Sequence, residues 1–436
     1  MKYLKKLTIV LLLALTIFCY TNVYASTNDK ITTYSPTCLL MESKTGTVLY
    51  EKNGYEKAYP ASTTKIMTAI LTMEHCSLTD VATASYDAVF TVPVGYSNAN
   101  IQVGEELTIY QLLNVLLIPS ANDAANVLAE HIAGSVGSFA DMMNAKAVEI
   151  GCLNTHFVNP NGVQNENHYS TAYDLALMGR YAMNNDTIRE IVNTTFYTLP
   201  ATNKYATNDR VFGTTNDLIK KNDSDSVDNY YYQYCTGIKT GYTNTAKSCI
   251  VASAKKDDVE YIVVILNAGR TENGLSARDI DCKNLFNYAF DNYTVKTLNE
   301  ENSVLKTTNV AKASNATKSL KVIVQDEINA VVKKDDISKI TPTVEINSDL
   351  KAPITKNSVI GKITYDIDGT IYSSSLLAGE NVLESNGFTT FLTVISLIVI
   401  LFLLYKLLNS DNNKKKKKSK KKSTKKVKRN NKYLYW

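Results

Sequence analysis

The sequence predicts an α/β domain, built from an antiparallel sheet and a helical subdomain, followed by a small all-β domain and a C-terminal transmembrane helix. Strand patterns at residues 38–50 and 250–266 bracket a helical middle, the order expected for a mixed α/β core. Short β patterns separated by Asp, Asn, Gly and Pro then run from about residue 320 to residue 372. Residues 388–405 carry no charge, and as a helix they would span about 27 Å, close to the thickness of a bilayer core.

The N-terminus has the three parts of a secretory signal. Lys2, Lys5 and Lys6 form a basic start, an apolar run follows over residues 7–18, and Val23-Tyr24-Ala25 ends in a small residue suited to cleavage. The alternative is an uncleaved membrane helix, but this apolar run is short for spanning a bilayer. We therefore expect a signal peptide over residues 1–25 and an exported mature chain.

The C-terminus predicts a membrane anchor over residues 388–408 and a Lys-rich tail over residues 409–436. The alternative is a core helix with a basic tail that binds nucleic acid, to which an exported protein has little access. The positive-inside rule places such a tail in the cytoplasm and the folded part on the other side of the membrane. The formal net charge of the whole chain is +5, to which the three lysines of the signal contribute +3 and residues 406–436 contribute +13. The exported part between them therefore carries a formal charge of −11. Any binding of an anionic group must then come from local cations.

The first domain, residues 26–296, begins with a predicted hairpin at 38–50 and a buried helix after Pro60. Further helices are expected at 105–118, which Pro119 ends, and at 123–132, which Gly134 ends. Two further strands are expected at residues 250–254 and 261–266, and a helix at 278–290. A small β-rich domain is then expected over residues 297–380. It contains a Ser/Thr/Asn/Lys linker at 307–319 and short strands at 320–324, 344–346, 359–363 and 370–372.

The cysteines and histidines show no spacing typical of a metal site. No C-x-x-C pair is present, and the four histidines are scattered, so we expect neither a metal nor another cofactor. Cys235 and Cys249 flank a Lys-Thr-Gly segment. They either pair across two strands or remain buried thiols.

The first chemical motif is Ser62-x-x-Lys65, at the predicted start of a buried helix. Residues three apart lie on one helix face, and a lysine buried among apolar residues has a lowered pKa. A neutral amine in that position can take the serine proton. The alternative is an N-cap serine with a lysine whose amine reaches solvent. The same spacing also starts at other serines, namely Ser253, Ser303, Ser348, Ser419 and Ser423.

Two further motifs follow in order. Ser120-Ala121-Asn122 comes 58 residues after Ser62, directly behind Pro119, where Ser120 or Asn122 can also cap the next helix. Lys239-Thr240-Gly241 comes 119 residues after Ser120 and leads into a strand, where Gly241 would let a ligand approach the strand edge. A second Lys-Thr-Gly, at 44–46, lies between two strand patterns and is typical of a hairpin turn.

With these motifs the chain resembles the serine D-alanyl-D-alanine carboxypeptidases, the low-molecular-mass penicillin-binding proteins. The resemblance covers about residues 35–290, and residues 297–380 more loosely. It implies the penicillin-binding/β-lactamase-like fold. Lys247 stands where this family often has glycine, and many relatives have an amphipathic anchor in place of a spanning helix. The segments that carry the resemblance are Pro60–Thr68, Ser120–Ala125, Asn159–Gly162, Ser170–Leu175 and Gly237–Thr243.

The resemblance implies a role for each motif residue. Ser62 attacks the terminal D-alanyl-D-alanine bond of a peptidoglycan stem pentapeptide, Lys65 is the general base, and Ser120 relays a proton to the leaving D-alanine. Penicillins are expected to acylate Ser62 and to be released from it only slowly. Four further residues bind the substrate. Those four are Asn122 at the substrate amide, Lys239 with Thr240 at the terminal carboxylate, and Tyr242, whose backbone amide forms the oxyanion hole with that of Ser62.

Arg278, at the start of a late helix, either binds the same carboxylate or makes only a salt bridge. Two other functions fit part of the pattern. A class A-like β-lactamase would need an acid that activates water after acylation, and Glu149 and Glu166 are the candidates. A non-hydrolytic penicillin sensor would need an output domain, which the tail of about 28 residues does not supply.

Overall fold

The computed structural model divides the chain into two compact units. The first comprises residues 1–298, 328–342 and 365–372, and the second the remaining residues. The predicted signal peptide and Lys-rich tail lie outside the described residues. The predicted domain limits at 296 and 380 remain a prediction, although β13 (Ile328–Lys333) pairs with β10 (Tyr293–Asn299) in the first unit. The structure describes residues 31–207, 210–221, 229–385, 387 and 391–408.

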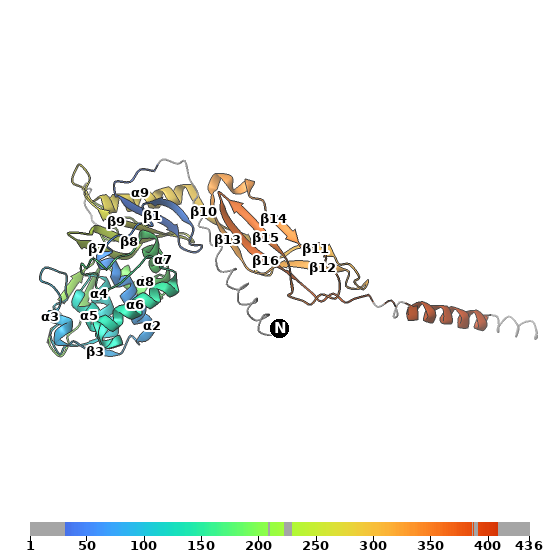
Figure 1. Cartoon of the computed structure of the whole chain (residues 1–436), viewed down its shortest axis with the longest axis horizontal. Helices are drawn as coiled ribbons and strands as arrows, with labels where there is room; N and C mark the ends of the chain where they lie inside the picture. The colour runs from blue at the N-terminus through green and yellow to red at the C-terminus, as the bar shows by residue number, and fades with distance from the viewer. Residues whose placement is uncertain (1–30, 208–209, 222–228, 386, 388–390, 409–436) are drawn as a thin grey trace, which may run out of the picture. The chain divides into compact units, whose positions relative to one another are not determined.

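The first unit is organised around a five-stranded sheet (Figure 1). Every pairing in it is antiparallel, and β7 forms one edge. The predicted hairpin is confirmed as β1 and β2, and Lys44-Thr45-Gly46 forms its turn, where Gly46 has a φ of 76°. From edge to edge the strands are β2 (Val48–Lys52), β1 (Thr37–Glu42), β9 (Val259–Ala268), β8 (Lys247–Lys256) and β7 (Cys235–Thr243).

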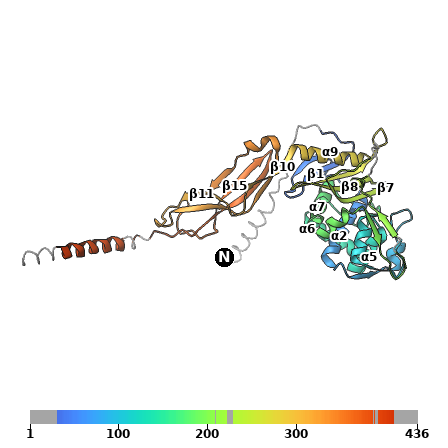
Figure 2. The same ribbon diagram turned by 180° about the vertical axis from the view of Figure 1, so that it is seen from behind.

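Alternation along the strands supplies two hydrophobic cores, because successive side chains point to opposite faces of the sheet. Leu39 and Met41 of β1 pack with the helical subdomain, whereas Cys38 and Leu40 pack against α9 (Ala277–Asn292) on the other face. Figure 1 shows α9 on one side of the sheet and the other α-helices of this unit on the opposite side, and Figure 2 shows the same layers from behind. The sheet is therefore buried on both faces.

The helical subdomain follows the predicted order. The short 3-10 turn η1 (Ala61–Thr64) leads into α2, and Gly134, with a φ of 76°, ends α5 as expected. The helices on this side of the sheet are α2 (Lys65–His75), α3 (Tyr86–Phe90), α4 (Ile109–Leu117), α5 (Asn122–Ala133), α6 (Val136–Ile150), α7 (Ala172–Ala182) and α8 (Asp186–Val192).

The helix expected from residue 105 begins later, at Ile109. Residues Glu106–Thr108 instead form β4, which pairs with β3 (Val81–Thr83). The Thr108 side chain accepts the backbone N–H of Gln111, and the Gln111 side chain accepts that of Thr108. This capping box fixes the start of the helix at Ile109, so the predicted helix began too early in the sequence. A second small ladder joins β5 (Phe196–Leu199) to β6 (Arg210–Gly213).

A second five-stranded sheet lies largely in the second unit, which also contains one apolar helix. The linker expected at 307–319 is wrong at its start, because residues 304–309 form an edge strand. The polar sequence Lys306-Thr307-Thr308-Asn309 is not typical of a strand, so the sequence did not predict it. The helix Phe391–Leu408 has a mean hydropathy of 2.6 and is long and apolar enough to cross a membrane. The sheet order is β11 (Val304–Asn309), β12 (Ser319–Val324), β16 (Thr370–Ala378), β15 (Val359–Ile367) and β14 (Thr343–Ile346). Together the two units confirm the predicted fold class.

Candidate active site

Ser62 lies in the 3-10 turn η1, directly before α2. Pro60 starts the turn by accepting the backbone N–H and the hydroxyl of Thr63, and Ala61 has a φ of 48°. A left-handed backbone at a residue other than glycine is strained and common at functional sites. The turn holds Ser62 at the floor of a cavity, with its side chain partly exposed to it.

Lys65 begins α2 one turn after Ser62 and is completely buried. Its Nζ lies 3.0 Å from Ser62 Oγ, 2.8 Å from Asn122 Oδ1 and 2.7 Å from the carbonyl oxygen of Asn161. Burial lowers the pKa of Lys65 well below its ordinary value, and the charge of Lys239 lowers it further, against an opposing effect of Asp123. The site therefore favours an uncharged amine beside the Ser62 hydroxyl.

Ser120 and Asn122 line the same cavity. Ser120 has a φ of 69°, is only 5% exposed, and its hydroxyl has no hydrogen-bond partner in the described part of the chain. The expectation that Ser120 or Asn122 caps the helix is wrong, since Ala121 is the N-cap of α5 and makes no side-chain cap. Asn122 instead donates its backbone N–H and its Nδ2 to the carbonyl of Ser97.

The opposite wall is the edge strand β7. Thr240, Gly241 and Tyr242 line the cavity, and the Tyr242 side chain is 62% exposed. A Cβ at Gly241 would lie 2.9 Å from the backbone nitrogen of Ser62, so β7 packs directly on η1. Glycine at 241 therefore allows this close approach of the turn that carries Ser62, and the predicted approach of a ligand to the same strand edge stays a prediction.

Two cations lie near the Thr240 end of the cavity. Arg278 lines it and donates to Asp279, with Asp217 3.5 Å away. Lys239 is 1% exposed, is absent from the lining, and donates to the carbonyl of Thr240 at 3.0 Å. Burial lowers the pKa of Lys239 to about 7, with a further contribution from the Arg278 charge. Lys239 is thus a buried residue of the β7 wall itself, whereas Arg278 lines the cavity.

These walls enclose an open cavity of about 550 Å³. Six of the seven residues expected from the sequence meet around it, because Ser62, Ser120, Asn122, Thr240 and Tyr242 line it and Lys65 contacts two of them. The seventh, Lys239, belongs to β7 but is buried and does not line the cavity, and its Nζ donates to the carbonyl of its neighbour Thr240. The remaining lining residues are Val94, Gly95, Tyr96, Ser97, Thr215, Asp217, Gly241, Thr243, Asn244 and Arg278.

Sequence reasoning missed two supporting groups. The Asn161 carbonyl contacts the Lys65 amine, and being backbone it leaves no sequence signal. His168 lies behind η1, with its Nε2 2.8 Å from the Thr64 hydroxyl and its Nδ1 accepting the backbone N–H of Val158. Burial lowers the pKa of His168 to about 4, with smaller effects of His156 and Lys65. A neutral imidazole with its proton on Nε2 fits both hydrogen bonds.

The acids and thiols considered from the sequence lie elsewhere. Neither Glu149 nor Glu166 lines this cavity. Glu149 pairs with Lys146 on α6, and Glu166 is exposed beside a second, separate pocket. Cys235 lies opposite Ala254 and Cys249 opposite Gly241, so the two do not face each other across the sheet. All six described cysteines are free thiols.

Comparison with known proteins agrees with this geometry. A family model described as D-alanyl-D-alanine carboxypeptidase matches residues 23–270, and a model of the penicillin-binding protein 5 C-terminal domain matches residues 293–384. The chain is 33% identical over 363 residues to the D-alanyl-D-alanine carboxypeptidase DacF of Bacillus subtilis, covering 81% of this chain and 87% of the relative.

Two further similarities extend along both units. The chain is 28% identical over 370 residues to the D-alanyl-D-alanine carboxypeptidase DacA of Escherichia coli, covering 83% of this chain and 86% of that protein. The solved structure of penicillin binding protein 5 from Haemophilus influenzae superposes with a TM-score of 0.69 and 26% identity, over 81% of this chain and 99% of that one.

Proposed function

The chain belongs to the D-alanyl-D-alanine carboxypeptidase family, whose members are serine-type, penicillin-binding hydrolases of peptidoglycan, and we propose that Ser62 is its nucleophile. The contact of Lys65 with three oxygens carries this proposal. A neutral amine has two N–H donors and one lone pair. The donors satisfy Asn122 Oδ1 and the Asn161 carbonyl, which leaves the lone pair for the proton of Ser62.

Acyl transfer then proceeds without a metal or a histidine. As Ser62 Oγ bonds to the carbonyl carbon of the penultimate D-alanine, its proton passes to Lys65. Ser120 lines the cavity and its hydroxyl has no hydrogen-bond partner among the described residues; it relays a proton to the leaving nitrogen as the C–N bond breaks. The backbone amides of Ser62 and Tyr242 stabilise the oxyanion, and each such donor contributes about 3 kcal/mol to lowering the barrier. Water completes the cycle by hydrolysing the ester.

The terminal carboxylate of the stem pentapeptide is bound at the Thr240 end of the cavity. Thr240 and Arg278 line this end, and Lys239, buried next to Thr240 in β7, adds a positive charge. Asn122 orients the substrate amide as well as Lys65. These local cations provide the anion selectivity that the acidic body of the protein does not.

Productive binding is expected to weaken as the pH rises through about 7. The pKa of Lys239 in the free enzyme is about 7, so its charge is present below that pH and lost above it. We expect kcat/KM for a pentapeptide to fall several-fold between pH 7 and pH 9, since kcat/KM reports the free enzyme. A peptide with an amidated C-terminus is the control and should show no such decline. Equal declines for both peptides would assign the decline to another group.

The helix Phe391–Leu408 anchors the protein in the membrane as a single span, in this proposal. Its length and apolar composition support the role. The Lys-rich sequence that follows the helix supports an orientation with the tail in the cytoplasm and the exported part of the chain outside, where peptidoglycan lies.

The test uses the full-length protein in detergent. Incubation with a synthetic pentapeptide ending in D-Ala-D-Ala should release free D-alanine, measured by mass spectrometry, and a fluorescent penicillin should form a long-lived adduct. Rapid penicillin turnover would instead indicate a β-lactamase. A stable adduct without D-alanine release would indicate a sensor. Either of these two outcomes would overturn the proposal.

A further inference from the structure

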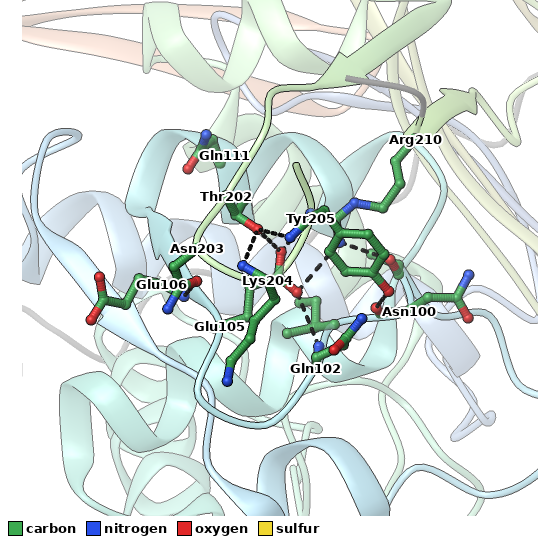
Figure 3. Close-up of polar contacts among 12 residues, drawn as sticks. Asn100, Gln102, Glu105, Glu106, Gln111, Thr202, Asn203, Lys204, Tyr205 and Arg210 are labelled. Carbon is green, nitrogen blue, oxygen red and sulfur yellow. Dashed lines mark hydrogen bonds and ion pairs between the residues drawn. The ribbon is translucent and has the colours of Figure 1, made fainter. Parts of the chain in front are cut away.

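A buried ion pair lies one loop away from the catalytic cavity. Arg210, at the start of β6, donates to Glu105, which directly precedes β4. Their Nη2 and Oε1 atoms are 2.5 Å apart, and the two side chains are 9% and 0% exposed. Figure 3 shows the two residues at the centre of a larger polar cluster, which contains residues from two loops.

The cluster joins loop 97–105 to residues 202–205, which precede β6. The Thr202 hydroxyl donates to Glu105, the Tyr205 hydroxyl donates to the carbonyl of Asn100 at 2.7 Å, and the Tyr205 ring lies 3.8 Å from the Arg210 guanidinium carbon (Figure 3). In addition, the Asn203 side chain accepts the backbone N–H of Glu106 and donates to the carbonyl of Gly104, and the backbone N–H of Gln102 donates to the Glu105 carboxylate.

The other end of loop 97–105 holds a residue of the proposed catalytic machinery. The carbonyl of Ser97 accepts both the backbone N–H and the Nδ2 of Asn122, at 2.9 and 2.7 Å. Because the Asn122 amide commits its NH2 group to Ser97, its Oδ1 faces the Lys65 amine. Asp123 fixes the middle of the loop by accepting the backbone N–H groups of Ala99 and Ile101.

Stability alone does not account for burying these charges. Desolvation of both ions is costly, and a buried ion pair can often be replaced by apolar side chains of similar volume without loss of stability. The Nε of Arg210 is also buried without a partner in the described residues, which adds to the cost. An ion pair specifies one geometry where apolar packing accepts several, so positioning is the function that fits the arrangement.

We propose that the Glu105–Arg210 pair positions Asn122 for catalysis by holding loop 97–105 in place. This inference rests on the proposed function, in which Asn122 orients Lys65. When the pair is broken, the loop relaxes and the Ser97 carbonyl moves. The Asn122 amide then no longer has one fixed orientation. Because a displacement of about 1 Å at a reacting group can reduce a rate about 100-fold, the acylation step is slowed, whereas the Thr240 end of the cavity is unaffected.

The test compares Glu105→Gln, which keeps the shape and removes the charge, with Glu260→Gln as a matched control. Glu260 pairs with Arg189 at 2.7 Å and joins α8 to β9, and neither residue lines the cavity. We expect E105Q to lower kcat for the pentapeptide and the rate of acylation by fluorescent penicillin about 10- to 100-fold, with KM nearly unchanged. Arg210→Lys, which keeps the charge, should lose less, and E260Q should behave as wild type.

Two outcomes overturn the inference. One is an E105Q protein that is folded and acylates at the wild-type rate, and the other is an E260Q protein that loses as much activity. Should E105Q fail to fold, Tyr205→Phe decides, since it keeps the pair and removes only the bond to Asn100. We expect a several-fold fall in kcat for Y205F, and no change would overturn the inference. If the wild type itself releases no D-alanine, the proposed function fails instead.

Discussion

Replacing Ser62 by alanine is expected to abolish both D-alanine release and covalent labelling by penicillin. The hydroxyl is the attacking group in our mechanism, and loss of a serine nucleophile lowers kcat by at least about 10⁴-fold in well-studied hydrolases. The fold should be retained, because the Ser62 hydroxyl makes its hydrogen bond with Lys65, at the cavity floor. Release is measured by mass spectrometry, labelling on a denaturing gel, and folding by thermal unfolding.

Ser303→Ala provides the matched control. Ser303 has the same Ser-x-x-Lys spacing to Lys306, but it lies in the second unit, and its hydroxyl donates to the carbonyl of Glu300. We expect S303A to retain the wild-type rate and labelling. A folded S62A protein that still binds penicillin covalently would exclude Ser62 as the nucleophile.

The sequence predicted which motif residues meet at the cavity better than it predicted their surroundings. Ser62 and Lys65 are three residues apart in one turn, so local geometry alone places their side chains together. The duplicated Lys-Thr-Gly at 44–46 was correctly assigned to a hairpin turn, since it lies between two strand patterns. Such inferences succeed where the chemistry depends on residues close in the chain or on a strong periodic pattern.

Contacts between distant loops were not predictable in this way. Glu105 and Arg210 are separated by 105 positions, one in a loop and the other at the start of a four-residue strand too short for its period to indicate which side chain faces inward. The carbonyls of Ser97 and Asn161 hold Asn122 and Lys65, but every residue has a carbonyl, so their roles have no residue-type signal. The buried position of Lys239 depends on how β7 packs on η1, which is tertiary information.

Replacing Gly162 by alanine is expected to disrupt the site from behind. Gly162 has a φ of 83°, and a Cβ there would lie 1.9 Å from the carbonyl oxygen of Ala61 and 3.0 Å from the Ser62 nitrogen. Both neighbours are backbone atoms, so the turn that carries the nucleophile must shift. Because Asn161 supplies an acceptor to Lys65, the shift also separates base and nucleophile. We expect kcat to fall by more than about 100-fold, measured with the pentapeptide assay.

Gly274→Ala separates this clash from backbone strain. Gly274 also has a left-handed backbone, with a φ of 75°, but among the described residues beyond its two chain neighbours no atom lies within 4 Å of the position of its Cβ. G274A therefore carries only the conformational cost of about 1 kcal/mol, seen as a small fall in the free energy of unfolding, and should keep its activity. G162A should lose more stability than this together with its activity. Equal losses of stability and activity in the two variants would contradict this prediction. They would mean that the backbone near Gly162 accommodates the Cβ without displacing Ser62, and that the close packing behind the turn is not required for acylation.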